Sequence, residues 1–239
     1  MFGRAGDNLG SSVVGVGDIN GDGIDDYCIG APFSDNQVGA AFVIYGRAGG
    51  SPDIYLSAFN HKQGFAIFGA ASSGLFGYAV SGVGDMNADN INDIAISSPF
   101  SASGKGVVYV IYGKAGYRDN IYIAAFTSAD GYRIFGGIVS GNAGFAISGM
   151  GDMNGDGLND VAVSTPYVND ARGTTYIVFG SSALRDVYLG DLSSTVGVLL
   201  LGSAVNTRSG FTVVCVGDVN GDGNSDMAIG EPQALSSSK

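Results

Sequence analysis

A nine-residue acidic motif occurs four times in this chain and constrains its fold more than any other feature. All four copies match D-x-N-x-D-[GN]-x-x-D, and they begin at Asp18, Asp85, Asp152 and Asp218. The spacing between successive copies is nearly constant, so one structural unit is repeated along the chain. Whatever local structure the motif forms is therefore expected four times.

Each motif has the composition of a calcium-binding loop. Calcium takes about six to eight oxygen ligands at roughly 2.3–2.6 Å. Side chains at loop positions 1, 3, 5 and 9, with the backbone carbonyl at position 7, would supply most of these oxygens. The sequence therefore predicts up to four Ca²⁺ sites, one per repeat. The expected ligands are Asp18, Asn20, Asp22, Ile24 and Asp26; Asp85, Asn87, Asp89, Ile91 and Asp93; Asp152, Asn154, Asp156, Leu158 and Asp160; and Asp218, Asn220, Asp222, Asn224 and Asp226.

An EF-hand begins in the same way but needs a bidentate Glu at loop position 12 and a helix on each side. Position 12 is occupied here by Ile29, Ile96, Val163 and Ile229. The flanks are short, rich in β-branched residues and interrupted by Gly, which is typical of strands. The motif is therefore predicted to be a β-hairpin loop in which Asp at position 9 supplies the final carboxylate.

A second alternative is an acidic turn that binds no ion, because Asn, Asp and Gly are ordinary turn residues. Four copies that keep every ligand position favour the calcium interpretation. The second loop has Asn90 where the others have Gly. Asn tolerates a positive φ better than most side chains, so we expect that loop to bind as well.

Composition limits the possible classes of protein. The chain has 239 residues, 45% of them hydrophobic, and 41 Gly residues without a collagen-like triplet, which predicts many short strands in one domain. Twelve of the 22 acidic residues lie at loop positions 1, 5 and 9, so the net charge of −11 is concentrated in the loops. The chain contains no basic stripe for nucleic acid and no apolar run long enough to form a transmembrane segment.

The residues that usually carry catalysis are scarce. The one histidine, His61, lies in a polar turn and is expected to be a solvated surface residue. Cys28 and Cys215 fall at non-equivalent places in their repeats and are expected to be two buried free thiols. Carboxylates that converge on a metal are stabilised in their charged form and do not serve as acids. The chain is therefore not expected to be an enzyme.

The segments around each acidic loop predict four antiparallel strands per repeat. The first strand is expected at 11–17, 78–84, 145–151 and 211–217, and the second at 26–30, 93–97, 160–164 and 226–230. The third is expected at 39–46, 106–113 and 173–180, and the fourth at 64–69, 131–136 and 197–202. Segments 54–56, 121–123 and 187–189 are expected to add short extended stretches. Four-stranded meanders packed radially make a β-propeller.

Short tags flank these strands. Gly30-Ala31-Pro32, Ser97-Ser98-Pro99, Ser164-Thr165-Pro166 and Gly230-Glu231-Pro232 follow the second strand, and Phe2-Gly3, Phe76-Gly77, Phe145-Ala146 and Phe211-Thr212 precede the first. Together with the acidic loop they resemble the FG-GAP repeat of the integrin α-subunit β-propeller over essentially the whole chain. The resemblance implies an all-β propeller with Ca²⁺ in its hairpin loops, an extracellular or cell-surface setting, and protein recognition on the opposite face.

The number of repeats departs from the seven blades of an integrin propeller. First and second strands occur four times but third and fourth strands three times, so we expect about three and a half blades. The units are predicted at 2–69, 76–136, 143–202 and 209–232, with a polar tail at 233–239. Unpaired strand edges at an open end are an aggregation hazard. A longer parent chain or an oligomer is therefore expected to complete the ring.

The loops between second and third strands are the predicted ligand face, at the end of the sheets opposite the acidic loops. Its candidate residues are Phe33, Asp35, Asn36, Phe100, Lys105, Tyr167, Asp170, Arg172 and Arg208. The recurrent aromatics Phe33, Phe100 and Tyr167 suit packing between blades better than ligand contact. The resulting hypothesis is a calcium-stabilised adhesion or recognition module with a protein partner. A glycan-binding propeller and an accessory domain of a larger surface enzyme are the alternatives.

Overall fold

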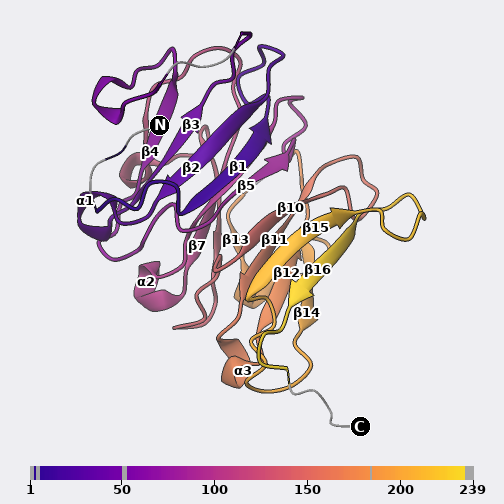
Figure 1. Ribbon diagram of the computed structural model, residues 1–239. Helices are drawn as coiled ribbons and strands as arrows, with labels where there is room; N and C mark the ends of the chain where they lie inside the picture. Colours follow the sequence, from indigo (N-terminus) through magenta and orange to yellow (C-terminus); the bar gives the residue numbers. More distant parts are fainter. Residues whose placement is uncertain (1–2, 4–5, 50–52, 184, 235–239) are drawn as a thin grey trace.

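The computed structural model describes residue 3 and residues 6–49, 53–183 and 185–234. It contains three four-stranded antiparallel blades followed by a two-stranded hairpin (Figure 1). The first blade is β1 (Ser12–Gly17), β2 (Asp26–Ala31), β3 (Ala40–Ile44) and β4 (Gly64–Phe68), and the second is β5 (Val80–Gly84), β6 (Asp93–Ser98), β7 (Val107–Ile111) and β9 (Gly131–Phe135). The third is β10 (Ile147–Gly151), β11 (Asp160–Thr165), β12 (Thr174–Val178) and β14 (Gly197–Leu201), and the hairpin is β15 (Thr212–Gly217) and β16 (Asp226–Gly230).

This architecture confirms the all-β, partial-propeller prediction. Every predicted strand is present, and the observed strands differ from the predicted ones by a few residues at their ends. The strands that begin the units, β1, β5, β10 and β15, lie side by side at the inside of the array. Serine hydroxyls link some of these inner strands, since Ser81 Oγ accepts a hydrogen bond from Gly149 N (3.0 Å) and Ser148 Oγ accepts one from Cys215 N (3.2 Å).

Apolar side chains fill the spaces between neighbouring blades. Phe65 and Ile67 of β4 pack with Ile96 of β6 between the first two blades. Ile134 of β9 packs with Val163 of β11 between the second and third. Each sheet is thus covered on the side that faces the next blade. This apolar packing between blades is the main hydrophobic stabilisation of the array.

Two short strands extend the blades in the parallel direction. β8 (Ile121–Tyr122) pairs with β4 of the preceding blade, and β13 (Val187–Tyr188) pairs with β9. Short 3-10 turns follow at η2 (Ile123–Ala125) and η3 (Leu189–Asp191), and η1 (Leu56–Ala58) is their counterpart in the first blade. The predicted extended stretches at 121–123 and 187–189 are therefore real, and they join consecutive blades at their outer edges.

The predicted second-to-third loops contain a single helical turn each. These turns are α1 (Ser34–Gln37), α2 (Ser101–Gly104) and α3 (Val168–Ala171). The second and third residues of each have left-handed backbone angles, such as Asp35 (φ 49°) and Asn36 (φ 54°), and the fourth also has a positive φ. Figure 1 shows the three turns in a row at one end of the blades. The predicted second-to-third loops are therefore present, and each is built around one short turn.

The structure also corrects the predicted tags before the first strands. One glycine before each first strand donates its N–H to a carbonyl near the end of the second strand. The pairs are Gly10 with Gly30, Gly77 with Ser97, Gly144 with Ser164 and Gly210 with Gly230. All four donor glycines have φ between 83° and 93°. These glycines are the equivalent positions, so Phe76-Gly77 corresponds to Ala143-Gly144 and Ser209-Gly210. The pairs Phe145-Ala146 and Phe211-Thr212 are offset, and Phe2 lies outside the described residues.

Both cysteines are free thiols, as predicted. Cys28 is fully buried, and burial raises the pKa of its thiol to about 12. Cys215 is half-buried, which corrects the expectation that both would be inside the core. Within the described residues, no helix is long and apolar enough to cross a membrane. Of the predicted tail, Gln233 and Ala234 are described, and residues 235–239 lie outside the described part.

A pair of glycine substitutions tests the close contact between a blade and the crossing to the next. Gly106 and Gly116 share a φ of +81°, but a Cβ on Gly106 would lie 2.3 Å from the Ala143 carbonyl oxygen, whereas one on Gly116 would meet nothing within 4 Å. We expect Gly116→Ala to cost about 1–2 kcal/mol from backbone strain. Gly106→Ala should cost roughly 1–3 kcal/mol more because the chain must also move apart. Urea unfolding midpoints measure the difference, and equal midpoints would contradict the predicted close approach.

Candidate functional site

Each acidic motif lies in the hairpin between the first and second strands of its unit. In the second blade the loop joins β5 to β6, with Gly84 opposite Asp93 and a bulge between Gly82 and Gly84. The same register shift occurs in the other three hairpins. No helix flanks any of the four loops, which excludes the EF-hand geometry. Asn90 has a φ of +66°, so it adopts the left-handed conformation that Gly adopts in the other loops.

The carboxylate at position 1 organises the loop backbone around itself. Asp18 Oδ1 accepts hydrogen bonds from Gly21 N (2.7 Å) and Asp22 N (3.1 Å), and its Oδ2 accepts one from Gly23 N (2.7 Å). Asp85, Asp152 and Asp218 accept the equivalent bonds in their own loops. Three amides that point at one carboxylate hold the turn tightly, so the loop shape is set before any ligand is considered.

Positions 3 and 5 form a second, smaller network. Asn20 Nδ2 donates to Asp22 Oδ2 (3.1 Å), Asn20 Oδ1 accepts from Asp22 N (2.9 Å), and Asp22 Oδ1 accepts from Ile24 N (2.9 Å). The same three contacts recur in the other loops. The side-chain oxygens of positions 1, 3 and 5 are therefore gathered in one short turn.

The carboxylate at position 9 has a structural role that the sequence did not reveal. Asp93 Oδ2 accepts from Met86 N (2.9 Å) in the loop, and its Oδ1 accepts from Gly113 N (2.8 Å) just after β7. Asp26 and Asp160 bond the equivalent amides of their blades. Asp226 bonds the loop amide of Val219 (2.9 Å) without a strand-three amide. The available signal was a Gly at the same offset after each of the first three position-9 Asps, just beyond the third strand.

Burial and neighbouring acids raise the pKa of these position-9 carboxyls. Desolvation is the largest cause, and the charged Asps at positions 5 and 1 add to it, while the two backbone hydrogen bonds act in the opposite direction. The pKa of Asp26 rises to about 6 and that of Asp93 to about 7. The pKa of Asp160 is raised for the same reasons. Ionised carboxylates thus repel one another in the first three loops.

The donor set suits a hard dication, because every side-chain donor at positions 1, 3, 5 and 9 is a carboxylate or amide oxygen. Burial is the main cause of the raised position-9 pKa values and repulsion from the neighbouring Asps adds to it; a bound cation would relieve that repulsion. Among the described residues, however, no three Asp, Glu, His or Cys side chains converge as a metal cluster. In this structure the carboxylates accept hydrogen bonds from loop amides. The oxygen donors of the loops suit calcium, and the assignment of individual calcium ligands stays a prediction.

The predicted ligand face lies at the other end of the blades. The crossings between blades bond to the helical turns there, since Asn142 N donates to the Gly104 carbonyl (2.8 Å) and Arg208 N to that of Ala171 (2.8 Å). The third-to-fourth segments lie at the acidic end, where Lys114 N donates to the Ile19 carbonyl (3.0 Å). The two ends of the sheets are therefore separate surfaces.

The candidate residues of this face are distributed over the three turns. Asp35, Asn36, Lys105 and Asp170 are exposed, and Arg172 and Arg208 are half-buried. The Arg208 guanidinium lies 5.4 Å from the centre of the Tyr167 ring. The Nε atoms of Arg172 and Arg208 are buried without a hydrogen-bond partner. The structure thus brings Tyr167 and Arg208 together beside α3, which also carries Asp170 and ends at Arg172. The remaining candidates lie on or next to α1 and α2.

The aromatics of this face pack within their own unit. Phe100 contacts Tyr78 edge-on (5.6 Å between ring centres), and Tyr167 contacts Phe145 in the same way (5.5 Å). Contact between blades is made by Tyr78 with Phe145 (5.4 Å). The predicted interblade role therefore belongs to the aromatic before the first strand, and Phe100 and Tyr167 support it. Phe33 is 39% exposed and Phe100 is 37% exposed.

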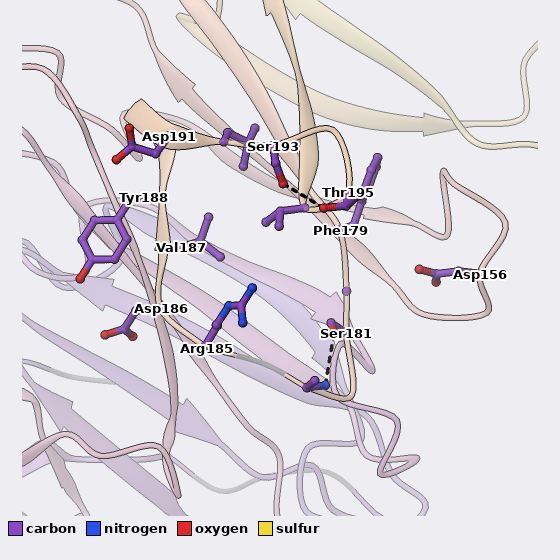
Figure 2. A pocket seen from close by; sticks show the side chains of 14 residues that line it. Asp156, Phe179, Ser181, Arg185, Asp186, Val187, Tyr188, Asp191, Ser193 and Thr195 are labelled. Atoms are coloured by element: carbon purple, nitrogen blue, oxygen red, sulfur yellow. Dashed lines mark hydrogen bonds between the residues drawn. The ribbon is translucent and has the colours of Figure 1, made fainter.

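Two cavities were not foreseen from the sequence. One of about 500 Å³ lies near the third acidic loop and is lined by Asp156, Phe179, Arg185 and Tyr188 among others. Figure 2 shows Arg185 directed toward its middle and Asp156 on a separate loop at its side. The other, of about 660 Å³, lies beside α1 and is lined by residues that include Asp35. Both are assembled from segments far apart in sequence, so no local motif marks them.

The remaining residues with reactive side chains show no catalytic arrangement in the described part of the chain. His61 is exposed, as predicted, and contacts the ring of Tyr117 edge-on at 5.9 Å. Cys28 is inside the core with a strongly raised thiol pKa, so it is a thiol and not a nucleophilic thiolate at neutral pH.

Comparison with known proteins agrees with this geometry. The FG-GAP repeat family matches residues 76–111, 144–178 and 211–238. The chain is 30% identical to integrin alpha-PS2 of Drosophila melanogaster over 236 residues, and 29% identical to integrin alpha-V of Gallus gallus over 231 residues; each match covers 93% of this chain. It is 34% identical to phosphatidylinositol-glycan-specific phospholipase D of Rattus norvegicus over 167 residues, which is 65% of this chain.

The matches cover 15%, 20% and 18% of those three relatives, so the chain spans a small part of their length. The repeated hairpins, the four-stranded blades and the three matched segments lead to one conclusion. The chain belongs to the FG-GAP repeat family and is a β-propeller segment similar to the propeller of integrin α subunits.

Proposed function

We propose that this chain is a non-catalytic, calcium-stabilised recognition segment of an extracellular or cell-surface protein. In this proposal, Ca²⁺ holds the acidic loops at one end of the blades, and a protein ligand binds the end formed by α1, α2 and α3. The similarity to integrin α subunits supports a role in adhesion or recognition. The extracellular setting follows from the FG-GAP resemblance.

The observation that carries the calcium part is the repulsion between carboxylates in the same loop. Burial is the largest cause of the raised pKa of Asp93, and Asp89 and Asp85 raise it further, although Asp93 accepts two backbone hydrogen bonds. A dication held by positions 1, 3, 5, 7 and 9 would offset this repulsion. The expected effect is on stability, because the ion would hold a turn and would not meet a substrate.

The ligand part rests on the contrast between constant backbone and variable side chains. The three turns share their left-handed geometry, yet the two left-handed residues are Asp and Asn in α1, Ala and Ser in α2, and Asn and Asp in α3. A rigid scaffold that presents different polar side chains at equivalent positions suits recognition. Beside α3, the Tyr167 ring and the Arg208 guanidinium supply the residue types that dominate binding energy at protein interfaces.

A second candidate function is an accessory propeller within a larger surface enzyme. The match to phosphatidylinositol-glycan-specific phospholipase D supports it. The catalytic groups would then lie elsewhere in a longer protein, and this segment would position that protein on its target. A longer parent chain or a partner chain that completes the propeller fits both candidates, and the sequence of the whole protein would separate them.

Calcium should stabilise the protein in a pH-dependent way. The folded-state pKa of Asp93 is raised to about 7 and that of Asp26 to about 6, so the metal-free protein loses stability as pH rises from about 4 to 7. Ca²⁺ favours the ionised carboxylates and competes with protons, so its effect should be small at pH 5 and full at pH 8. With a Kd on the order of 10⁻⁴–10⁻³ M, free Ca²⁺ at ten times Kd would add about 1.4 kcal/mol per site. Calorimetric Tm with Ca²⁺ or a chelator measures this, and a pH-independent or absent shift would contradict it.

Removing one position-5 carboxylate should remove one site. We expect Asp89→Ala to lower the Ca²⁺ stoichiometry from four to three and to leave the other loops intact, because each loop lies on a separate hairpin. Isothermal titration calorimetry measures the stoichiometry. Asp170→Ala is the matched control, since Asp170 is an exposed acid at the opposite end of the blades. Unchanged stoichiometry in Asp89→Ala would argue against the ligand assignment.

The recognition surface can be tested with cells and immobilised protein. Arg208→Ala removes the guanidinium beside Tyr167, so cell attachment should fall several-fold if this face binds a cell-surface protein. Lys114→Ala is the charge-matched control because Lys114 is exposed at the acidic end. Circular dichroism checks that both variants fold. Equal attachment by Arg208→Ala and the unaltered chain would show that Arg208 is not part of the recognition surface.

A further inference from the structure

Among the described residues, nothing covers the outer edge of the third blade as short strands cover that edge of the other two blades. In β14, Val198 is 43% exposed, Leu199 49%, Leu200 39% and Leu201 56%. The equivalent residues of the first blade are buried, with Phe65 1%, Ala66 2% and Ile67 0% exposed. Four successive exposed apolar residues on an edge strand are an unpaired and hydrophobic surface.

The structure shows what covers the same edge in the first two blades. β8 of the second blade lies parallel to β4 of the first, with Ile121 opposite Ile67 and Tyr122 opposite Phe68. β13 of the third blade repeats this on β9, with Val187 opposite Ile134 and Tyr188 opposite Phe135. In both cases an apolar residue followed by Tyr, from the next unit, closes the outer edge of the blade before it.

We call each of these covering segments an edge clip, and three contacts define it. The first two are made by an Asn or Asp residue (Asx) and by the apolar residue that follows it. Asn120 Oδ1 accepts a hydrogen bond from Ala66 N (2.8 Å), and Asp186 Oδ1 accepts one from Arg133 N (2.9 Å). The following apolar residue is buried, with Ile121 6% and Val187 9% exposed.

The third contact is the tyrosine, which stacks on the strand's last aromatic. The ring centres of Phe68 and Tyr122 are 5.2 Å apart with an interplanar angle of 25°, and those of Phe135 and Tyr188 are 5.0 Å apart at 16°. The clip pattern is therefore Asx, then Ile or Val, then Tyr.

β14 presents the matching positions without an occupant among the described residues. Leu199, Leu200 and Leu201 stand where Ala66, Ile67 and Phe68 stand in β4 and where Arg133, Ile134 and Phe135 stand in β9. The Leu199 N–H thus corresponds to the two amides that bond the Asx side chain. Leu201 replaces the aromatic on which the Tyr ring stacks, and its exposed side chain offers an apolar surface to the same ring.

We propose that the outer edge of β14 binds, in the parallel direction, an Asx-(Ile/Val)-Tyr segment carried by a further FG-GAP unit. The proposal is independent of the calcium and ligand-face proposals, because it concerns the outer edge of the last full blade. The chain's own third copy of the pattern, Asp53-Ile54-Tyr55, does not fill the edge. Ile54 is 5% exposed and packs in the core of the first blade.

The charges at the two known clips indicate which Asx residue fits. Asp186 meets Arg133, whose guanidinium donates to both of its carboxylate oxygens (3.2 and 2.6 Å). Asn120 accepts a hydrogen bond from the amide of Ala66, whose side chain is uncharged. Leu199 resembles Ala66 in this respect, and a carboxylate there would lose hydration without gaining a cation. The clip for β14 should therefore carry Asn in preference to Asp.

A tethered copy of a native clip tests the proposal. The full chain is extended at its C-terminus by a flexible Gly/Ser linker of about 20 residues, which spans roughly 25 Å, and then by a second copy of residues 119–126. Tethering gives an effective concentration on the order of millimolar, so a weak segment can bind. We expect hydrogen exchange at the Leu199 amide to slow by about tenfold or more relative to the same chain carrying a scrambled tag.

Substitutions made in the tag alone leave the folded chain untouched. Tyr122→Ala in the tag should remove most of the protection, and Asn120→Asp should weaken it more than Asn120→Gln does. Equal exchange at Leu199 with the native and scrambled tags would overturn the proposal, because the clip sequence would then contribute nothing. Slow exchange in the untagged chain at high dilution would also overturn it, because the edge would then already be covered.

Discussion

The position-9 carboxylate is the contact on which each blade depends. Asp93 is fully buried and joins two backbone amides, one in its own loop and one just after the third strand, so a single side chain fixes the loop relative to the sheet. A buried charge without such partners would be costly. The two amides lower the pKa of Asp93 while burial and the neighbouring Asp89 and Asp85 raise it. Each of the first three loops is therefore held in a balance between hydrogen bonding and repulsion that a cation would shift.

Packing between blades then determines how the units are arranged. The inner strands approach closely enough for serine hydroxyls to bond the next strand, as Ser81 does with Gly149, and apolar residues fill the wider spaces outside. At the outer edges, β8 and β13 clip one blade to the one before. Each unit thus completes its predecessor. The last full blade lacks that completion within the described residues, and its Leu199 and Leu201 are 49% and 56% exposed, whereas Ala66 of β4 is 2% exposed and Phe68 is half-buried.

The two ends of the sheets have different physical properties. The acidic end carries the carboxylates of the first and fifth loop positions and the Asn amide of the third, in turns held by their own backbone amides. The opposite end carries short left-handed turns whose backbone is constant and whose polar side chains vary. The acidic loops and the surface proposed for recognition therefore lie at different ends of the blades. This separation follows from the meander topology, in which alternate turns lie at opposite ends of a sheet.

The sequence by itself determined the repeat, the strands and the fold class, because these follow from local patterns: acidic turn residues at fixed spacing and β-branched runs between glycines. It also placed the acidic loops and the α1, α2 and α3 turns at opposite ends. Only the tertiary structure showed that Gly77 corresponds to Gly144 and that Tyr78 meets Phe145 across a blade boundary. The tertiary structure also showed that Asp93 accepts a hydrogen bond from the Gly113 amide and that Tyr122 stacks on Phe68. It further showed that the residues of β14 are exposed at the outer edge of the third blade. These contacts join residues about 20 to 67 positions apart, where pairing depends on how whole blades pack and no local spacing records it.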